Sequence, residues 1–350
     1  MTAARHLNAG KPRRPAWIAP LALLTVVIGG GVGIGLLTSP GGGNADGTTA
    51  LLQSGKSELM RGTPGSIGRA RELFGEAAAR DPDNAGNHAQ LALADLRLIE
   101  STPRAAADAL LRAHAAATRA VELDPDLADA QAALGYTTFF WHGDWPGGMA
   151  RLEQAVALDP ASARARHWRG LALLYKGDTT RGLADLDAAF RAAPAERAII
   201  ADRGLALVLA GRADEGLAAL RRLAREEPEF AGAARNLALA QLARGDDAAW
   251  LESEERAAIL LGDNTGADAI AAGRAALGNG RVAALTAILS RVSGAYRRAR
   301  LLALLGRADD ALVALENARR DPAFLTIRLD PAFASLRADP RFQALSASLG

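Results

Sequence analysis

Charged and apolar side chains are separated at the start of the chain. Residues 1–15 carry four basic side chains and no acidic one, and residues 15–45 contain no charged side chain. Within this stretch, residues 16–38 form a 23-residue apolar run, and about 20 helical residues are enough to cross a hydrocarbon core. The pattern predicts a single transmembrane helix over residues 16–38, with residues 1–15 as a basic cytoplasmic tail and the remainder exported.

A cleaved signal peptide is the alternative interpretation of this segment. The apolar run is longer than the usual ~7–15 residues of a signal peptide, and the nearest small-residue cleavage site, at residues 43–45, follows a polar stretch. We therefore expect an uncleaved anchor, followed by a flexible linker over residues 39–50. Glycines spaced for close helix approach would allow a homodimer through the membrane helix. They are Gly29, Gly31, Gly33 and Gly35.

Beyond the linker, helix-breaking residues recur at a fixed period. Prolines that end apolar stretches stand 43, 35, 34 and 34 residues apart, at Pro82, Pro125, Pro160, Pro194 and Pro228. Glycines suited to a left-handed helix end are also 34 apart, at Gly177, Gly211 and Gly245, with Gly306 in a later pair. A 34-residue period is typical of helix–turn–helix units.

These units resemble the tetratricopeptide repeat (TPR) family, whose pattern is W-x2-L-G-x2-Y, A-x3-F, A and a final P. The third unit matches best, with Leu134 and Gly135 on its first helix and Leu152, Ala155 and Pro160 on its second. The resemblance implies an all-α fold, a right-handed α-solenoid of seven or eight helix pairs over residues 51–320.

The match to the family pattern departs in three places. Glycine stands where the second helix normally has a small alanine, at Gly148, Gly182 and Gly216. The second unit is about nine residues longer than the period, through a longer loop or longer helices around residues 101–107. The register is also blurred over residues 263–294.

A shorter repeat marks the C-terminus. The tetrapeptides DPAF, DPAF and DPRF begin at Asp321, Asp330 and Asp339, nine residues apart. Asp at the N-cap followed by Pro is typical of a helix start. We expect residues 321–350 to form capping helices that insert phenylalanines into the last pair. These are Phe324, Phe333 and Phe342.

Three segments are similar to the extracytoplasmic TPR half of membrane-anchored, ToxR/CadC-like bacterial regulators. They read DPDLADAQAALGY, HGDWPGGMARLEQAVALDP and LDPAFASLRADPRFQAL. In that family a winged-helix DNA-binding domain precedes the membrane helix. Residues 1–15 are too short for such a domain, so we expect no nucleic-acid binding from this chain.

Composition argues against catalysis. There is no cysteine, which excludes disulfides and thiolate metal sites, and 41 basic against 39 acidic residues give a net charge of only +2. The five histidines lack metal-binding spacing, and no nucleophile or phosphate-loop motif is present. We expect no enzyme activity, no cofactor and no metal. The WHGDW stretch at 141–145 is either a binding spot or padding of a helix turn.

The TPR resemblance also implies a ligand groove lined by the first helix of each unit. Several of these positions could instead be core between repeats. The positions expected to meet a partner are Tyr136, Phe139, Phe140, Arg164, His167, Leu171, Tyr175, Arg235 and Leu239. No chaperone-type carboxylate clamp occurs there, and the apolar, aromatic character favours a protein or peptide ligand.

These observations predict a membrane-anchored TPR scaffold. We expect it at a bacterial inner membrane, single-pass, with a cytoplasmic N-terminus and the repeats in the periplasm. The alternative is the sensor part of a transmembrane transcriptional-regulatory system whose DNA-binding domain is missing or on another chain.

Overall fold

The computed structural model describes residues 42–101, 106–140 and 143–349. All of the described elements belong to one compact unit, Gly41–Gly350. The expected tail and transmembrane helix, residues 1–38, lie outside the described residues. No helix among the described residues is long and apolar enough to cross a membrane.

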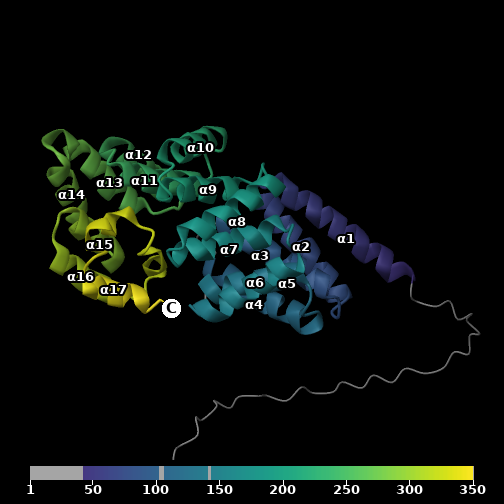
Figure 1. Ribbon diagram of the computed structural model, residues 1–350. Coiled ribbons are helices and arrows are strands. Elements are labelled where there is room, and N and C mark those ends of the chain that lie inside the picture. Colours follow the sequence, from purple (N-terminus) through teal and green to yellow (C-terminus); the bar gives the residue numbers. More distant parts are fainter. Residues whose placement is uncertain (1–41, 102–105, 141–142, 350) are drawn as a thin grey trace, which may run out of the picture. The chain divides into compact units, whose positions relative to one another are not determined.

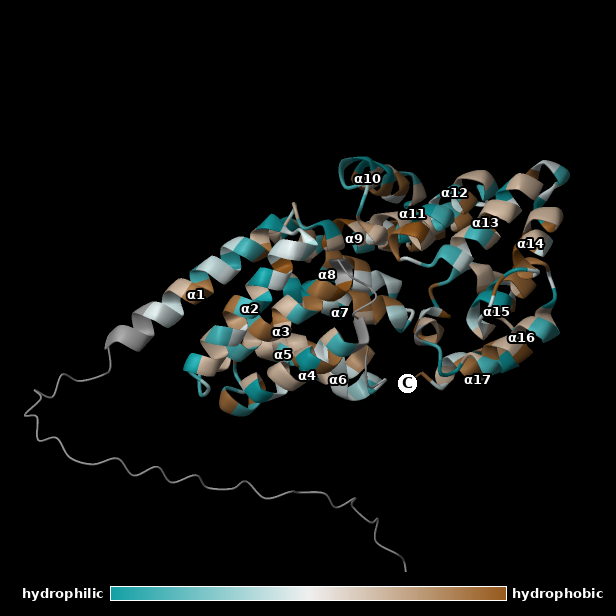
Figure 2. Ribbon diagram, turned by 180° about the vertical axis from the view of Figure 1, so that it is seen from behind, coloured by the Kyte–Doolittle hydropathy of each residue, from teal (hydrophilic) through white to brown (hydrophobic). Residues whose placement is uncertain are grey.

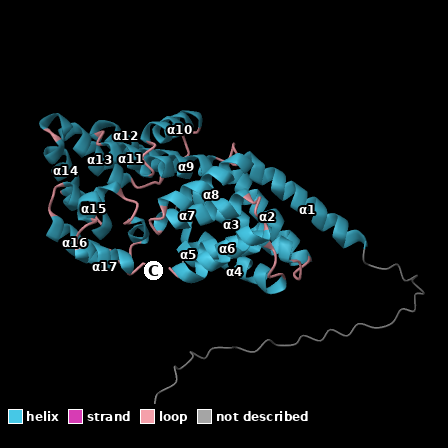
Figure 3. Ribbon diagram, viewed as in Figure 1, coloured by secondary structure: helices cyan, strands magenta, loops and turns pink. Residues whose placement is uncertain are grey.

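The described part of this unit is built from helices, with no strand in it (Figures 1 and 3). Sixteen α-helices follow one another as eight pairs, and each helix packs against its pair partner. The pairs are α1 (Gly42–Arg61) and α2 (Pro64–Arg80), α3 (Ala85–Ser101) and α4 (Ala106–Leu123), α5 (Ala128–Phe140) and α6 (Trp145–Leu158), α7 (Ala163–Tyr175) and α8 (Thr179–Ala192), α9 (Arg197–Leu209) and α10 (Ala213–Glu226), α11 (Ala231–Arg244) and α12 (Asp247–Leu260), α13 (Asn264–Ala276) and α14 (Arg281–Leu289), and α15 (Ala295–Leu304) and α16 (Ala308–Asn317). A short turn, η2 (Leu277–Asn279), lies between α13 and α14.

The periodic glycines form the turns between paired helices. Gly177, Gly211, Gly245 and Gly306 have φ values from 73° to 88°, the left-handed conformation that only glycine adopts without strain. At the end of α7 the Gly177 amide donates to the Leu174 carbonyl (2.8 Å), and the Asp178 amide donates to the Leu173 carbonyl (2.9 Å). The 34-residue glycine spacing is therefore the spacing of helix ends.

Glycine also lets the two helices of a pair approach closely. A Cβ atom at Gly216 would lie 2.4 Å from the Gly204 carbonyl oxygen, and one at Gly182 would lie 2.9 Å from the carbonyl of Gly170. Alanine does not fit at these separations. Glycine in place of the family's second-helix alanine therefore allows the backbones of the two paired helices to come into contact.

The irregular regions of the sequence correspond to altered helix lengths. In the second unit α3 and α4 have 17 and 18 residues, against 13 or 14 in the helices from α5 to α12. The longer second unit therefore contains longer helices. Residues 263–294, where the repeat register is blurred, include α14, which has only nine residues.

The expected linker differs from the structure. Helix α1 begins at Gly42, so residues 42–50 are helical. Thr48 is buried, and the ring of Phe74 in α2 lies so close to Gly55 that a Cβ atom there would be 2.5 Å from it. Local composition is poor in helix formers here, and packing against α2 stabilises the helix instead.

The C-terminal segment consists of two 3₁₀ turns and one helix: η3 (Pro322–Thr326), η4 (Pro331–Leu336) and α17 (Pro340–Ala347). Each begins at an aspartate whose side chain accepts a backbone N–H bond, as the Asp-Pro repeat predicts. The three phenylalanines are at most 3% exposed and pack into the cluster that includes the last pair. The segment is thus a cap on the array. Apolar residues, brown in Figure 2, recur along the helices of the array, and the buried ones form hydrophobic clusters.

Candidate functional site

A cavity lies where the first helices of several pairs face the C-terminal segment. These first helices are called the A helices below. The cavity has a volume of about 640 Å³, within the range of about 300–1,000 Å³ usual for ligand sites. Four of the predicted partner residues line it: Leu171 and Tyr175 from α7, and Arg235 and Leu239 from α11. We call it the A-helix pocket.

Two polar side chains of the A-helix pocket are available to a ligand. Among the described residues, no hydrogen bond or ion pair engages the Tyr175 hydroxyl or the Arg235 guanidinium. Burial raises the pKa of Tyr175, the positive charge of Arg235 opposes this rise, and the carboxylate of Asp202 adds to it. The hydroxyl therefore stays protonated near neutral pH, as a donor close to a positive charge.

A ladder of polar contacts joins successive A helices along one side of this pocket. His167 Nε2 lies 2.8 Å from Asp202 Oδ2, and Asn236 Nδ2 donates to Asp202 Oδ1 over 2.9 Å. Burial pushes the pKa of Asp202 up, but the hydrogen bond and charge of His167 and the charge of Arg235 hold it below its ordinary value. The carboxylate is already satisfied, so it orients neighbouring helices and is not free to react.

The opposite wall of the pocket is a second ion cluster, centred on Arg300 of α15. Its Nη1 donates to Glu254 Oε1, and its Nε pairs with Asp330 Oδ2, each over 2.7 Å. The Tyr296 hydroxyl donates to the same Asp330 oxygen over 3.1 Å and contacts the Thr326 hydroxyl at 2.5 Å. Burial would lower the pKa of Arg300, but the two carboxylates raise it above its ordinary value, so the guanidinium remains charged.

The predicted aromatic residues belong mainly to the core. Phe139 is completely buried, and its ring centroid lies 4.3 Å from that of Trp145. Tyr136 and Phe140 are half-buried, and their ring centroids are 4.5 Å apart. The ring centroid of Phe140 also lies 5.2 Å from that of Tyr175. Phe139 is therefore core between repeats and does not face a groove. Trp145 is 2% exposed, which agrees with the turn-padding interpretation of the WHGDW stretch, while residues 141–142 lie outside the described part.

Arg164 and His167 line a different, smaller cavity of about 230 Å³. Its other wall is α3, whose Arg97 donates Nη2 to Glu196 Oε2 over 2.9 Å, 99 residues away along the chain. Arg164 itself pairs with Asp129 of the preceding A helix at 3.2 Å. The predicted groove is thus divided into this cavity, the A-helix pocket and an aromatic core.

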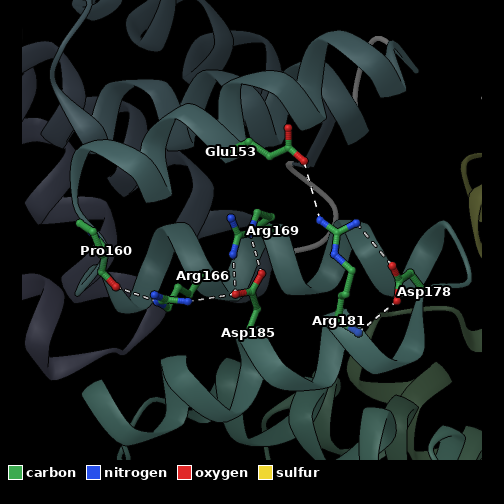
Figure 4. Close-up of polar contacts among 7 residues, drawn as sticks. All are labelled: Glu153, Pro160, Arg166, Arg169, Asp178, Arg181 and Asp185. Atoms are coloured by element: carbon green, nitrogen blue, oxygen red, sulfur yellow. Dashed lines mark hydrogen bonds and ion pairs between the residues drawn. The ribbon is translucent and has the colours of Figure 1, made fainter.

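A third polar cluster lies between α7 and α8 (Figure 4). Asp185 is 5% exposed, and Arg169 donates to both of its carboxylate oxygens, at 2.6 and 2.7 Å. Arg166 bonds to Asp185 (3.1 Å) and to the Pro160 carbonyl (2.7 Å). Every charge here is paired, so the cluster holds the helix pair together. No group of three possible metal ligands occurs among the described residues.

Sequence reasoning missed Asp202, Asn236 and the C-terminal wall. The spacing of these residues could have indicated them. His167 and Asp202 are 35 residues apart, and Asp202 and Asn236 are 34 apart. Tyr296 and Asp330 are also 34 residues apart. Polar residues recurring at the repeat period on A helices mark contacts between neighbouring pairs.

Comparison with known proteins places the fold only broadly. No protein-family model matches the chain, and no curated protein matches it. Among solved structures it is similar to TTC0263, a thermophilic TPR protein of Thermus thermophilus, with 20% identity over 56% of this chain and 99% of that one (TM-score 0.43). It is also similar to PilF of Pseudomonas aeruginosa, with 18% identity over 70% of this chain and 97% of that one (TM-score 0.39). A third similar structure is YrrB, described as a TPR protein with an unusual peptide-binding site, with 20% identity over 55% of this chain and 94% of that one (TM-score 0.36). The helix pairs themselves, which recur with a period of 34 residues, define the class: an all-α helical repeat protein.

Proposed function

We propose that this chain is a membrane-anchored scaffold that binds a protein or peptide partner at the A-helix pocket. The observation that supports this best is the pocket itself, which combines apolar side chains with Tyr175 and Arg235, two polar side chains that no hydrogen bond or ion pair engages among the described residues. An apolar cavity with a few convergent polar groups is the usual form of a binding site. Arginine and tyrosine are also enriched among residues that dominate binding energy.

The carboxylates around this pocket support a preformed binding surface. Asp202 is engaged by His167 and Asn236, while Glu254 and Asp330 are engaged by Arg300. These contacts join neighbouring helices and so hold the walls of the pocket in place.

Anchoring at a bacterial inner membrane, with the repeats on the extracytoplasmic side, is the second part of the proposal. It rests on the basic residues 1–15 and the uncharged apolar residues 16–38. A second candidate is the sensor part of a transmembrane transcriptional-regulatory system, favoured by the resemblance of the three segments quoted in the sequence analysis. An adjacent reading frame encoding a winged helix would distinguish the two.

Photo-crosslinking tests the proposed site. A benzoylphenylalanine at position 239, in the pocket wall, is expected to give a discrete partner adduct that Arg235→Ala reduces. The matched control is the same probe at Arg222, whose side chain is 73% exposed on α10. Equal adducts from both positions would contradict the site. A reporter fused after residue 350 tests the topology, and a cytoplasmic signal would contradict the extracytoplasmic location.

A further inference from the structure

Residues 327–330, between η3 and η4, do more than close the last helix pair. This four-residue stretch, Ile327 to Asp330, is called the strap. It reaches across to helices α6 to α9, about 150 residues earlier in the chain: the Arg328 guanidinium donates to the Lys176 carbonyl, 152 residues away. A cap needs to cover only the last pair, so these contacts require a separate explanation.

The strap adds a leucine to an apolar cluster built by three consecutive helices. Leu329 is 6% exposed and belongs to a cluster with Leu174 of α7, Leu186 of α8 and Leu207 of α9. Those three side chains are held by their own helix pairs. They therefore form an apolar subsite whose shape does not depend on which chain supplies the leucine.

The strap also places an arginine beside this leucine subsite. The Arg328 guanidinium carbon lies 5.7 Å from the centre of the Trp145 ring, within cation–π range. Its Nη1 donates to the carbonyl of Lys176 at the end of α7 over 3.4 Å, and its Nε donates to the Ser346 hydroxyl of α17 over 2.7 Å. Trp145, Lys176 and Ser346 form an arginine subsite.

Arg328 is weakly compensated in this position. Burial lowers the pKa of Arg328, and no carboxylate pairs with it in the described part of the chain. All of its hydrogen bonds go to neutral acceptors, among them the Ser346 carbonyl, to which Nη2 donates over 2.5 Å. The strap is therefore held by the burial of Leu329, by the ion pair of Asp330 and by the hydrogen bonds of Arg328.

The strap borders the A-helix pocket. Leu329 and Asp330 are part of its wall, so displacing them opens the pocket towards α7 and α9. A partner that took over the two subsites would also gain access to Tyr175 and Arg235.

We infer that the strap marks a docking surface for an extended partner segment that presents an arginine followed directly by a leucine, which replaces Arg328 and Leu329. The inference rests on the proposed function, because it names the kind of segment that the scaffold recognises. The strap is then a tethered competitor, present at an effective concentration of the order of mM for a short connection.

A labelled peptide of residues 325–335, LTIRLDPAFAS, tests the inference by fluorescence anisotropy on the full chain. The double variant Arg328→Ala/Leu329→Ala removes the competitor and is expected to bind the peptide at least about 10-fold more tightly than the unsubstituted chain. Arg320→Ala, an exposed arginine just before the cap, is the matched control and is expected to leave binding unchanged. The peptide with alanine in place of its Arg–Leu pair is expected not to bind.

Helix content and melting temperature of each variant provide the folding control. If the double variant unfolds, Arg328→Ala alone replaces it, because that side chain has no buried ion pair to lose. A benzoylphenylalanine in place of the peptide's leucine is expected to crosslink within α7 to α9. Crosslinks confined elsewhere, or equal affinity of the double variant and the unsubstituted chain, would overturn the inference.

The two proposals fail separately. If position 239 still captures a partner in an Arg235-dependent way while this peptide does not bind, the Arg–Leu inference is wrong and the scaffold function stands. If the peptide binds at the two subsites but a probe at position 239 captures nothing, the Arg–Leu inference is supported and the proposed partner site at the A-helix pocket is wrong.

Discussion

The two DPAF motifs of the C-terminal segment should differ sharply in their contribution to stability. The Asp321 and Asp330 side chains each accept a backbone N–H bond, at 2.9 and 3.0 Å, so each provides an N-cap worth about 1 kcal/mol. Only Asp330 is also buried against Arg300. Removing one partner of a buried ion pair costs about 3–5 kcal/mol. Glu254 still pairs with Arg300, so we expect the lower end for Asp330→Ala, about 3 kcal/mol beyond the cap.

Urea unfolding, followed by circular dichroism and tryptophan fluorescence, measures this difference. We expect a large fall in the midpoint for Asp330→Ala and a small one for Asp321→Ala. Asp330→Asn separates the two effects, because asparagine is an equally good N-cap but carries no charge. It should lose most of the stability that Asp330→Ala loses. Equal midpoints for Asp321→Ala and Asp330→Ala would refute the assignment of the ion cluster.

Two further predictions concern helix contact and acid stability. Gly216→Ala should lower the melting temperature, because its Cβ would lie 2.4 Å from the Gly204 carbonyl oxygen. Gly68→Ala, with nothing within 4 Å, should raise the melting temperature, because the helix propensity of alanine adds up to about 1 kcal/mol to the free energy of unfolding. Changes of the same sign would contradict the close-contact argument. The pKa of Asp202 is held below its ordinary value, so its contribution is present at neutral pH and is lost as pH falls below about 4 and through the folded-state pKa. The stability difference between the unsubstituted chain and Asp202→Asn should therefore shrink in acid, and a constant difference would argue against the bond to His167.

The sequence predicts the repeat fold well because its signals are local and periodic. A left-handed turn needs glycine wherever a helix ends, so Gly177, Gly211 and Gly245 show the unit length directly. The Asp-Pro motifs predict the three C-terminal helix starts for the same reason, since capping involves only neighbouring residues. These features depend on no distant part of the chain.

The site is less predictable because distant residues build it. Family geometry places Phe139 in a groove, but the side chain is completely buried, with its ring against those of Phe140 and Trp145. Helix α1 extends over residues 42–50, where composition suggests a linker, because α2 supplies the packing. Leu329 belongs to the same buried cluster as Leu207, 122 residues earlier, and no local pattern encodes this placement.

Hydrogen exchange of the chain with and without its crosslinking partner tests the central claim most directly. If the partner binds at the A-helix pocket, backbone amides of α7 and α11 and of residues 321–336 should change their exchange rates, while the second helices α8 and α10 should not. Protection confined to α8 and α10, with α7, α11 and the C-terminal segment unchanged, would contradict the account.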